Sequence, residues 1–403
     1  MTISALLVMA VTPYAAGEAA VMSIDAGKSA TPISKYVYGQ FIEHLGHCIY
    51  NGIWAEMLED RKFYCAVGDK ESLWKVVGDG AIVMDTSHPY VGAHSPAIPA
   101  GHGIVQEGLG LLAGRDYIGR IVLAGAGDVK VSLIWGSASE DRQTVSIDGL
   151  RDAFQKHDLR FTAKASTDTA RFEITGSAPF RIGAVSLMPS DNVEGLRADV
   201  LALLKELDAP IYRWPGGNFV SGYDWRDGLG DPDLRPPRKN PAWRGVEHND
   251  FGLHEFLRFC AILGTDPYIV VNSGQGDVQL ARDEVEYVVG AASTPQGKLR
   301  ARNGHTDPWC VEWWGVGNEM YGDWQLGHMP LGEYVKKHNQ FADAMRAVDP
   351  KMKLIGVGAT GEWSEAMLAQ CSDHMNLLSE HFYCQDKPDV VEHVRQIPEN
   401  VKG

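Results

Sequence analysis

The sequence has little of what nucleic-acid or metal binding requires. It contains 37 Lys and Arg residues against 52 Asp and Glu residues, which gives a formal net charge of −15. Phosphate binding needs clustered cations, so nucleic acid and anionic membrane are not expected as partners. The 6 cysteines are widely scattered, without a Cys-x-x-Cys pair or a Cys/His ligand spacing. A structural zinc site is therefore not expected, and nothing in the sequence indicates a metal or organic cofactor.

Long apolar runs are also scarce. Beyond the amino terminus, no stretch is long and apolar enough to span a membrane. Residues 3–16 are apolar and are followed by small residues, as in a signal peptide, although the positively charged start is missing. Two interpretations of residues 1–20 are therefore open. One is a signal peptide, with an extracellular or periplasmic location; the other is a short apolar arm, with which a cytoplasmic location is compatible.

What the sequence does contain fits a large α/β protein. A length of 403 residues with 44% hydrophobic content exceeds one ordinary domain and suits a barrel-sized unit plus a smaller one. The 11 Trp residues are compatible with sugar binding, because aromatic planes stack on the apolar faces of sugar rings. Packing in a hydrophobic core would explain the number of Trp residues equally well.

The patterning along the chain predicts an interrupted barrel. Residues 21–66 are expected to form an amino-terminal strand and the first βα unit, including a helix at 52–61. Residues 67–190 contain short alternating runs, which predict an inserted all-β sandwich of jelly-roll type. Residues 191–403 alternate strands with helices, as in units two to six of a (β/α)8 barrel. A closed barrel has eight units, so the six expected here form either an open sheet or an incomplete TIM barrel.

Polar side chains follow the predicted strands. Because the carboxyl ends of parallel strands share one rim of a barrel, these side chains are expected to meet there. Each residue alone could instead be a turn residue or a helix cap. Together, amides and carboxylates without a cationic cluster suit a neutral ligand with many hydroxyl groups. The residues concerned are Glu43, His44, Asn218, Asn272, Asn318, Glu319, His381 and Tyr383.

The segment CVEWWGVGNEMY, at 310–321, contains the strongest single candidate. A buried strand ends there in Asn318 and Glu319. Burial beside two Trp side chains is expected to raise the pKa of the Glu319 carboxyl, which would suit a general acid. The alternative is that Asn318 and Glu319 only cap the next helix.

Six motifs resemble those of the α-L-arabinofuranosidases of glycoside hydrolase family 51. These are retaining enzymes on a clan A barrel, and the resemblance is to the subgroup with an inserted sandwich similar to a carbohydrate-binding module. The motifs are YGQFIEHLG at 38–46, GIWAEMLEDRKF at 52–63, RWPGGNF at 213–219, YDWRDG at 223–228, WGVGNE at 314–319 and SEHFY at 379–383.

The resemblance implies a function and a set of site residues. The function is removal of non-reducing terminal α-L-arabinofuranosyl residues from an arabinose-containing plant polysaccharide or oligosaccharide. Glu319 would be the acid/base, and Asn318 would hold the sugar 2-hydroxyl. The sugar pocket would be shaped by Glu43, Asn218, His381 and Tyr383, with Trp54 and Trp225 lining it. Asn272 joins them as a substrate-binding candidate at the same rim.

The family's second carboxylate, the nucleophile, is expected at the end of a seventh strand, beyond Gly403, so the chain is expected to be shorter than the family's barrel. Retaining hydrolysis needs this group about 5 to 5.5 Å from the acid. Two substitutes are not favoured. Glu362 stands at a helix start, where acidic residues are common. Glu380 adjoins His381, so on a strand it should point to the opposite face.

Two other functions stay open on sequence grounds. Clan A barrels share the Asn-Glu pair, so an endo-glucanase or xylosidase would have the same scaffold. A non-catalytic carbohydrate-binding protein, in which the sandwich binds the sugar, is the alternative from another class. The sequence does not indicate an oligomeric state.

Overall fold

The computed structural model describes residues 25, 27–28 and 31–402. The predicted signal peptide at 1–20 and the strand expected at 21–24 lie outside the described residues. The chain divides into two units, residues 1–37 and residues 38–403. A short 3-10 helix, η1 (Lys35–Tyr38), spans the boundary.

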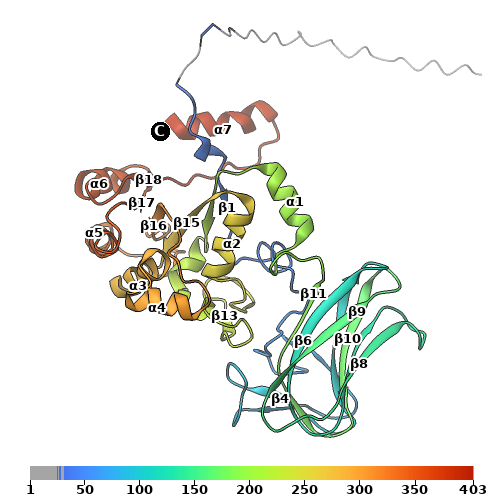
Figure 1. The fold of residues 1–403 in the computed structure, drawn as a ribbon. Helices are drawn as coiled ribbons and strands as arrows, with labels where there is room; N and C mark the ends of the chain where they lie inside the picture. The colour runs from blue at the N-terminus through green and yellow to red at the C-terminus, as the bar shows by residue number, and fades with distance from the viewer. Residues whose placement is uncertain (1–24, 26, 29–30, 403) are drawn as a thin grey trace, which may run out of the picture. The chain divides into compact units, whose positions relative to one another are not determined.

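Six parallel strands form one sheet in the order β1-β12-β15-β16-β17-β18, with helices packed along it (Figure 1). Each neighbouring pair is parallel, which confirms the prediction of a partial barrel. The strands are β1 (Gln40–Phe41), β12 (Ile211–Trp214), β15 (Asp266–Val271), β16 (Trp313–Val316), β17 (Lys353–Val357) and β18 (Leu377–Ser379).

The helices follow the strands as a βα pattern requires. In α2 the Glu255 carboxylate accepts the backbone N–H of Gly252, and the helix ends at Gly264 with φ 72°, a left-handed conformation that glycine adopts without strain. Sequence patterning did not find α4, because its surface is almost entirely polar. The helices are α1 (Ala198–Leu207), α2 (Leu253–Leu263), α3 (Val278–Val289), α4 (Pro295–Arg302), α5 (Leu331–Arg346), α6 (Glu362–Cys371) and α7 (Val390–Lys402).

The inserted domain is an antiparallel sandwich of two five-stranded sheets, ordered β2-β5-β10-β7-β8 and β3-β4-β11-β6-β9. Alternate side chains of both sheets fill a separate apolar core, as two stacked sheets require. The strands are β2 (Lys75–Val77), β3 (Val83–Asp85), β4 (Ser95–Ile98), β5 (Gly103–Leu111), β6 (Asp116–Gly125), β7 (Val129–Ile134), β8 (Arg142–Ile147), β9 (Gln155–Thr162), β10 (Thr167–Gly176) and β11 (Phe180–Pro189). A small ribbon of β13 (Arg238–Lys239) and β14 (Val246–Glu247) lies in a barrel loop.

The helix predicted at 52–61 is wrong. This segment is irregular, with positive φ angles at Asn51, Asp60 and Phe63 that a helix excludes. Its polar groups bond outside a helix: the Glu56 carboxylate accepts the backbone N–H groups of Leu58 and of Leu187 in the sandwich. The helix between β1 and β12 is α1, so the sandwich interrupts the first βα unit before its helix.

A buried ionic network joins the sandwich to the barrel. Asp233, in a barrel loop, accepts hydrogen bonds from Arg61 at 2.8 Å and from Arg120 of β6 at 2.7 Å. Arg61 also forms two bonds with Asp250, at 2.5 and 2.7 Å, and Lys62 reaches the same carboxylate at 2.8 Å. Burial opposes ionisation of both aspartates, but the cations outweigh it, so the pKa of Asp233 and that of Asp250 lie well below the ordinary range.

This network predicts acid sensitivity. A carboxyl with a depressed folded-state pKa stabilises the fold above its unfolded pKa, about 4, and this contribution is lost as the pH falls through the folded value. The contribution of this network, measured as the difference in the free energy of unfolding between the unmodified protein and Asp233→Asn, should therefore be similar at pH 7 and pH 5 and clearly lower at pH 3. Urea titrations at the three pH values measure it. A contribution that is equal at pH 5 and pH 3 would show that the pKa of Asp233 is not lowered in the folded state.

The two outer strands of the sheet leave apolar side chains uncovered. Phe41 of β1 and Leu377 of β18 are exposed, as expected for an open barrel with two edges. One face of α7 exposes Val390, Val394 and Ile397. Within the described residues, no helix has the length and hydropathy to cross a bilayer, and all six cysteines are free thiols.

Candidate active site

Glu319 lies just beyond the carboxyl end of β16, whose residues are all buried. The turn depends on Gly317, which has φ 89° and where a Cβ would collide with the Ser273 hydroxyl. Glu319 itself has φ 37°, a conformation that few side-chain-bearing residues adopt. The sharp turn directs the carboxylate to the rim of the sheet, where it is 9% exposed.

The Glu319 carboxylate is held between two hydrogen-bond donors. His381 Nδ1 lies 2.7 Å from Oε1, and the indole N–H of Trp324 donates to Oε2 at 2.7 Å. The bond to His381 lowers the pKa of Glu319, burial raises it, and Trp324 lowers it further; the net shift is downward. The upward shift predicted from the two neighbouring Trp residues is therefore wrong. Hydrogen bonds to the charged form outweigh the partial burial.

Asn318 is fixed on both sides of its amide. Its Oδ1 accepts from the Arg213 guanidinium at 2.5 Å, and its Nδ2 donates to Gln325 Oε1 at 2.8 Å. Arg213 is positioned in turn by its neighbours, since the guanidinium carbon lies 4.6 Å from the centre of the Phe41 ring. Asn318 is therefore pre-oriented beside Glu319, which fits a group that holds one hydroxyl in a defined place.

Glu43 lies beyond the carboxyl end of β1 and is buried. Its Oε1 accepts the backbone N–H groups of Gly217 and Phe219, at 2.9 and 3.2 Å, and the indole N–H of Trp243 at 2.9 Å. Gly216 is required here, because a Cβ at that position would collide with the Glu43 side chain. The loop after β12 thus wraps around the carboxylate and holds it rigidly.

The structure brings Glu43 and Asn318 to the same place. A Cβ on Gly217 would lie 3.4 Å from Asn318 Nδ2 and 3.6 Å from Glu43 Oε1, so this glycine separates the two side chains. A cavity of about 310 Å³ opens beside them, lined by Arg213, Asn318 and His381 with residues of β17 and β18. Its size is at the lower end of small-ligand pockets.

Two predicted amides are engaged in loop structure. Asn218 Nδ2 donates to the Trp324 carbonyl at 2.9 Å, and its Oδ1 accepts from Leu326 N at 2.8 Å, so it fixes the segment that contains Trp324. Asn272 donates to the Tyr223 carbonyl and accepts two backbone N–H groups in the following turn. Asn272 therefore acts as a turn residue in this structure. This is the role that the sequence left open for each of the strand-end residues taken alone.

Four other predicted residues are not among the hydrogen-bond partners of the Glu319 carboxylate. Trp225 is 1% exposed, packs against Tyr287 and donates to the Leu280 carbonyl, so it belongs to the barrel core. Trp54 packs at the junction with the sandwich and does not line the cavity beside Asn318. Tyr383 is 78% exposed and follows β18 at the open side of the sheet. His44 is buried between Glu247 and Trp214.

Sequence reasoning missed the three side chains that hold the carboxylates and the amide in place. Arg213 lies within a quoted motif, Trp324 lies five residues after one, and Trp243 lies outside them; only their partners were identified. Trp324 is 60% exposed, which is unusual for an indole whose N–H bonds a buried carboxylate. An isolated aromatic residue five positions after the candidate acid is the one signal that could have identified it.

Of the two carboxylates that were not favoured as nucleophiles, Glu362 does not line the cavity beside Asn318, whereas Glu380 does. Glu362 is exposed at the start of α6. The Glu380 carboxylate accepts a hydrogen bond from the Ser364 hydroxyl of α6, on the helix side of the strand. No group of three His, Cys, Asp or Glu side chains suited to a metal ion occurs among the residues that the structure describes.

Fold and site together place the chain among barrel proteins whose buried carboxylates and amides gather at the carboxyl ends of parallel strands. Comparison with known proteins defines the family. Residues 203–402 match the alpha-L-arabinofuranosidase 1 domain. The matched region belongs to the α-L-arabinofuranosidases of glycoside hydrolase family 51.

Two curated relatives show the extent of the match. Alpha-L-arabinofuranosidase C of Emericella nidulans is 43% identical over 176 residues, which are 44% of this chain and 35% of the relative. The intracellular exo-alpha-(1->5)-L-arabinofuranosidase of Bifidobacterium longum is 37% identical over 206 residues, which are 49% of this chain and 36% of the relative. The chain thus spans little more than a third of the length of these proteins.

Two solved structures are similar to the chain. The arabinose complex of the α-L-arabinofuranosidase from Thermotoga maritima is 40% identical, with a TM-score of 0.51, and the match covers 53% of this chain and 45% of that one. An arabinose-bound family 51 α-L-arabinofuranosidase is 23% identical, with a TM-score of 0.69. That match covers 81% of this chain and 59% of the other, and it shows that the two share a fold.

Proposed function

We propose that the chain is the acid/base-bearing part of a retaining α-L-arabinofuranosidase that removes non-reducing terminal α-L-arabinofuranosyl residues from arabinan or arabinoxylan. The observation that supports this most strongly is the position of Glu319 at the end of β16, where it is held by His381 and Trp324 beside the fixed amide of Asn318. The two curated relatives described above are α-L-arabinofuranosidases, which agrees with this proposal. Export of the protein stays a prediction from residues 1–20.

The proposed reaction has two steps. In the first, protonated Glu319 transfers its proton to the glycosidic oxygen, the bond from that oxygen to the anomeric carbon breaks, and a second carboxylate bonds to the anomeric carbon. In the second, the Glu319 carboxylate takes a proton from water, whose oxygen displaces the second carboxylate and releases arabinose with retained configuration. That second carboxylate is expected on a seventh strand, whereas the described part of the chain forms six.

The other residues have positioning and binding roles in this proposal. The fixed amide of Asn318 would hold the sugar 2-hydroxyl, and Glu43 would accept hydrogen bonds from further hydroxyls through the oxygen that the loop after β12 leaves free. His381 and Trp324 would stabilise the charged form of Glu319, which acts as the base in the second step. Because these hydrogen bonds lower the pKa of Glu319, they also reduce the fraction of Glu319 that is protonated at neutral pH.

Replacement of Trp324 by Phe is expected to raise the pKa of Glu319. The substitution keeps an aromatic ring but removes the N–H that stabilises the charged carboxylate. The alkaline limb of the pH–rate profile, where the acid form is lost, should therefore move to higher pH. Carboxyl ¹³C NMR of the chain measures the same shift directly, and the Glu319 signal is identified by its absence in Glu319→Gln. A pKa that stays constant or falls would contradict this role of Trp324.

Hydrolysis of 4-nitrophenyl α-L-arabinofuranoside tests the proposed function. The chain alone should turn over little or none, since the nucleophile is expected elsewhere. The same chain joined to the seventh and eighth barrel strands of a family member should release nitrophenol. Activity of the fusion on aryl β-D-xylopyranoside or aryl β-cellobioside in place of the arabinofuranoside would instead favour a xylosidase or an endo-glucanase. Inactivity of both forms on all three substrates would favour a carbohydrate-binding protein.

A further inference from the structure

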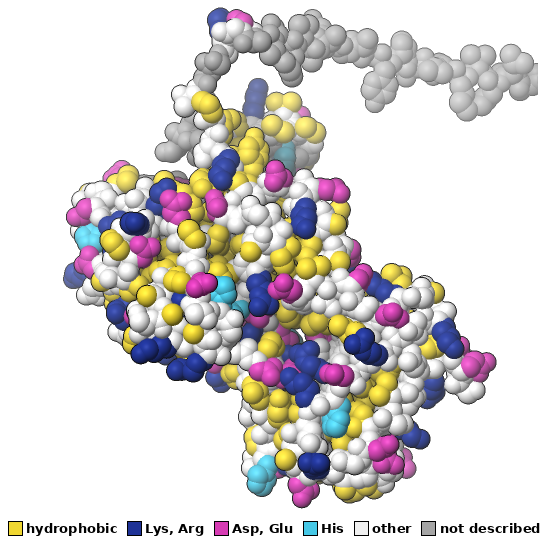
Figure 2. All heavy atoms as spheres, viewed as in Figure 1, with side chains coloured by type: hydrophobic (Ala, Val, Ile, Leu, Met, Phe, Trp, Pro, Cys, Tyr) yellow, Lys and Arg dark blue, Asp and Glu magenta, His cyan; other side chains and the backbone are white. Residues whose placement is uncertain are grey.

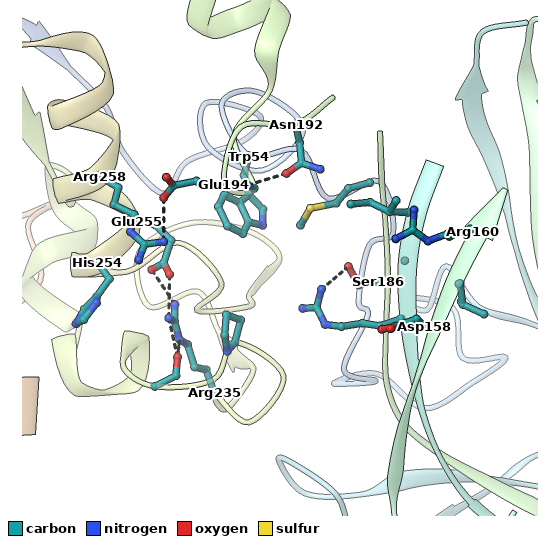
Figure 3. A pocket seen from close by; sticks show the side chains of 18 of the residues that line it. Trp54, Asp158, Arg160, Ser186, Asn192, Glu194, Arg235, His254, Glu255 and Arg258 are labelled. Atoms are coloured by element: carbon teal, nitrogen blue, oxygen red, sulfur yellow. Dashed lines mark hydrogen bonds and ion pairs between the residues drawn. The ribbon is translucent and has the colours of Figure 1, made fainter. Parts of the chain in front are cut away.

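A polar cleft lies where the barrel and the sandwich meet, apart from the Glu319 site. Its volume is about 630 Å³, within the usual range for ligand pockets. Space-filling Figure 2 shows acidic and basic side chains gathered at this junction. Figure 3 shows that barrel residues form one wall and β6, β9 and β11 of the sandwich the other. The proposed catalytic reaction uses none of these side chains.

Trp54 projects into this cleft from the barrel side (Figure 3). Its ring is held from behind by Gly195, with φ 88°, where a Cβ would collide with the indole. Phe251 packs against it edge to face, with ring centres 6.0 Å apart. Trp54 is 5% exposed, and its indole N–H has no hydrogen-bond partner. Buried N–H groups are almost always bonded, so this donor marks a place for a ligand acceptor.

Charged side chains of both signs line the two walls. On the barrel side Arg258 pairs with Glu194 at 2.9 Å, and Arg235 forms two bonds with Glu255, at 2.9 and 3.0 Å. On the sandwich side Asp158 and Arg160 are exposed neighbours on the same face of β9.

The nearly equal numbers of positive and negative side chains in the cleft favour a neutral ligand. Four arginines and three carboxylates line the cleft, so its charges nearly cancel, and burial lowers the pKa of His254 to about 4, which keeps that ring neutral near pH 7. The carboxylates would repel a phosphate or a polyuronate. Arg–carboxylate pairs supply donors and acceptors side by side, and each sugar hydroxyl both donates and accepts. An aromatic ring beside such pairs fits the apolar face of a sugar.

We propose that this cleft is a second carbohydrate-binding site, which takes a short neutral oligosaccharide segment between the Trp54 ring and the Asp158–Arg160 pair. That the glycan is an arabinose-bearing polysaccharide rests on the proposed function. The binding itself does not, because none of these residues contacts Glu319. The site would retain the polymer on the protein while terminal arabinose units are removed.

Affinity electrophoresis of the 403-residue chain in native gels that contain arabinan or neutral arabinoxylan tests this site. At least one polymer should retard the chain, and the Asp158→Ala/Arg160→Ala variant should bind at least ten-fold more weakly. Both residues are exposed on a strand, so their loss should leave the fold intact. The matched control is Lys130→Ala/Asp168→Ala, two exposed charges on the other sheet of the sandwich, which should leave retardation unchanged.

The outcomes separate this proposal from the proposed function. Retardation that persists in Glu43→Ala/Asn318→Ala, which lacks both side chains proposed to hold the sugar in the catalytic site, would place the binding outside that site and support the cleft. Binding by the 403-residue chain, together with no hydrolysis by the chain joined to the two remaining barrel strands, would overturn the proposed function alone. Absence of retardation by either polymer, or equal retardation of the Asp158→Ala/Arg160→Ala variant and its control, would overturn the cleft proposal.

Discussion

Replacement of Glu319 by Gln should lower kcat for a 4-nitrophenyl α-L-arabinofuranoside by about 10²- to 10⁴-fold in a form of the protein with a complete barrel. The amide keeps the shape and accepts the Trp324 hydrogen bond, but it can neither protonate the glycosidic oxygen nor activate water. Steady-state kinetics at several pH values measures the loss. The ionisation assigned to Glu319 should also disappear from the pH–rate profile.

The dependence on the leaving group distinguishes an acid from a structural residue. A substrate with an acidic leaving group needs little protonation, so its first step should suffer much less in Glu319→Gln than that of a substrate with a basic leaving group. Glu362→Gln is the matched control, because this exposed carboxylate at the start of α6 has no part in the proposed site. An equal loss for all leaving groups, or a similar loss in the control, would argue against the acid/base role.

Replacement of Asp233 by Asn should destabilise the protein by about 3 kcal/mol, because breaking a buried ion pair leaves its partners uncompensated. Asp233 accepts from Arg61 and Arg120 and pairs with Lys156 at 2.9 Å, so one carboxylate joins the barrel to two strands of the sandwich. The main loss of stability arises because Arg61 and Arg120 would stay in place without the negative charge of Asp233 that compensates them. Urea unfolding at pH 7, followed by tryptophan fluorescence, measures the change.

The matched control is Asp199→Asn, which removes an exposed ion pair with Arg197. Exposed pairs contribute about 0–1 kcal/mol, so this variant should remain close to the unmodified protein. A loss of less than about 1 kcal/mol in Asp233→Asn would mean that the apolar contacts between the domains are sufficient without the ionic network.

The alternation of strands and helices from residue 191 onward was readable from the sequence because each buried strand is a short apolar run. β16, with all four residues buried, is the clearest case. The sandwich could be predicted because apolar and polar residues alternate along its strands with a period of two and show no helical spacing. α4 was not, since its polar surface gives no periodic signal. The helix predicted at 52–61 was wrong because the apolar positions of this segment have helical spacing, whereas buried charges such as Glu56 hold the backbone in an irregular path.

The site was predictable only in part, because spacing locates residues and does not reveal their partners. The sequence placed Glu319, Asn318 and Glu43 at strand ends, where the structure has them. The direction of the Glu319 pKa shift depends on His381, which is 62 positions away along the chain and lies 2.7 Å away in space. Likewise, whether a Trp lines a pocket or fills a core depends on tertiary packing, and Trp225 lies in the core.

The central claim is that Glu319 is the acid/base of an α-L-arabinofuranosidase. Its most direct test is release of 4-nitrophenol from 4-nitrophenyl α-L-arabinofuranoside by the chain joined to the two remaining barrel strands of a family member, with the Glu319→Gln form beside it. The account predicts turnover with retained configuration at the anomeric carbon, lost on the substitution. Turnover that survives in Glu319→Gln, or a product of inverted configuration, would contradict it.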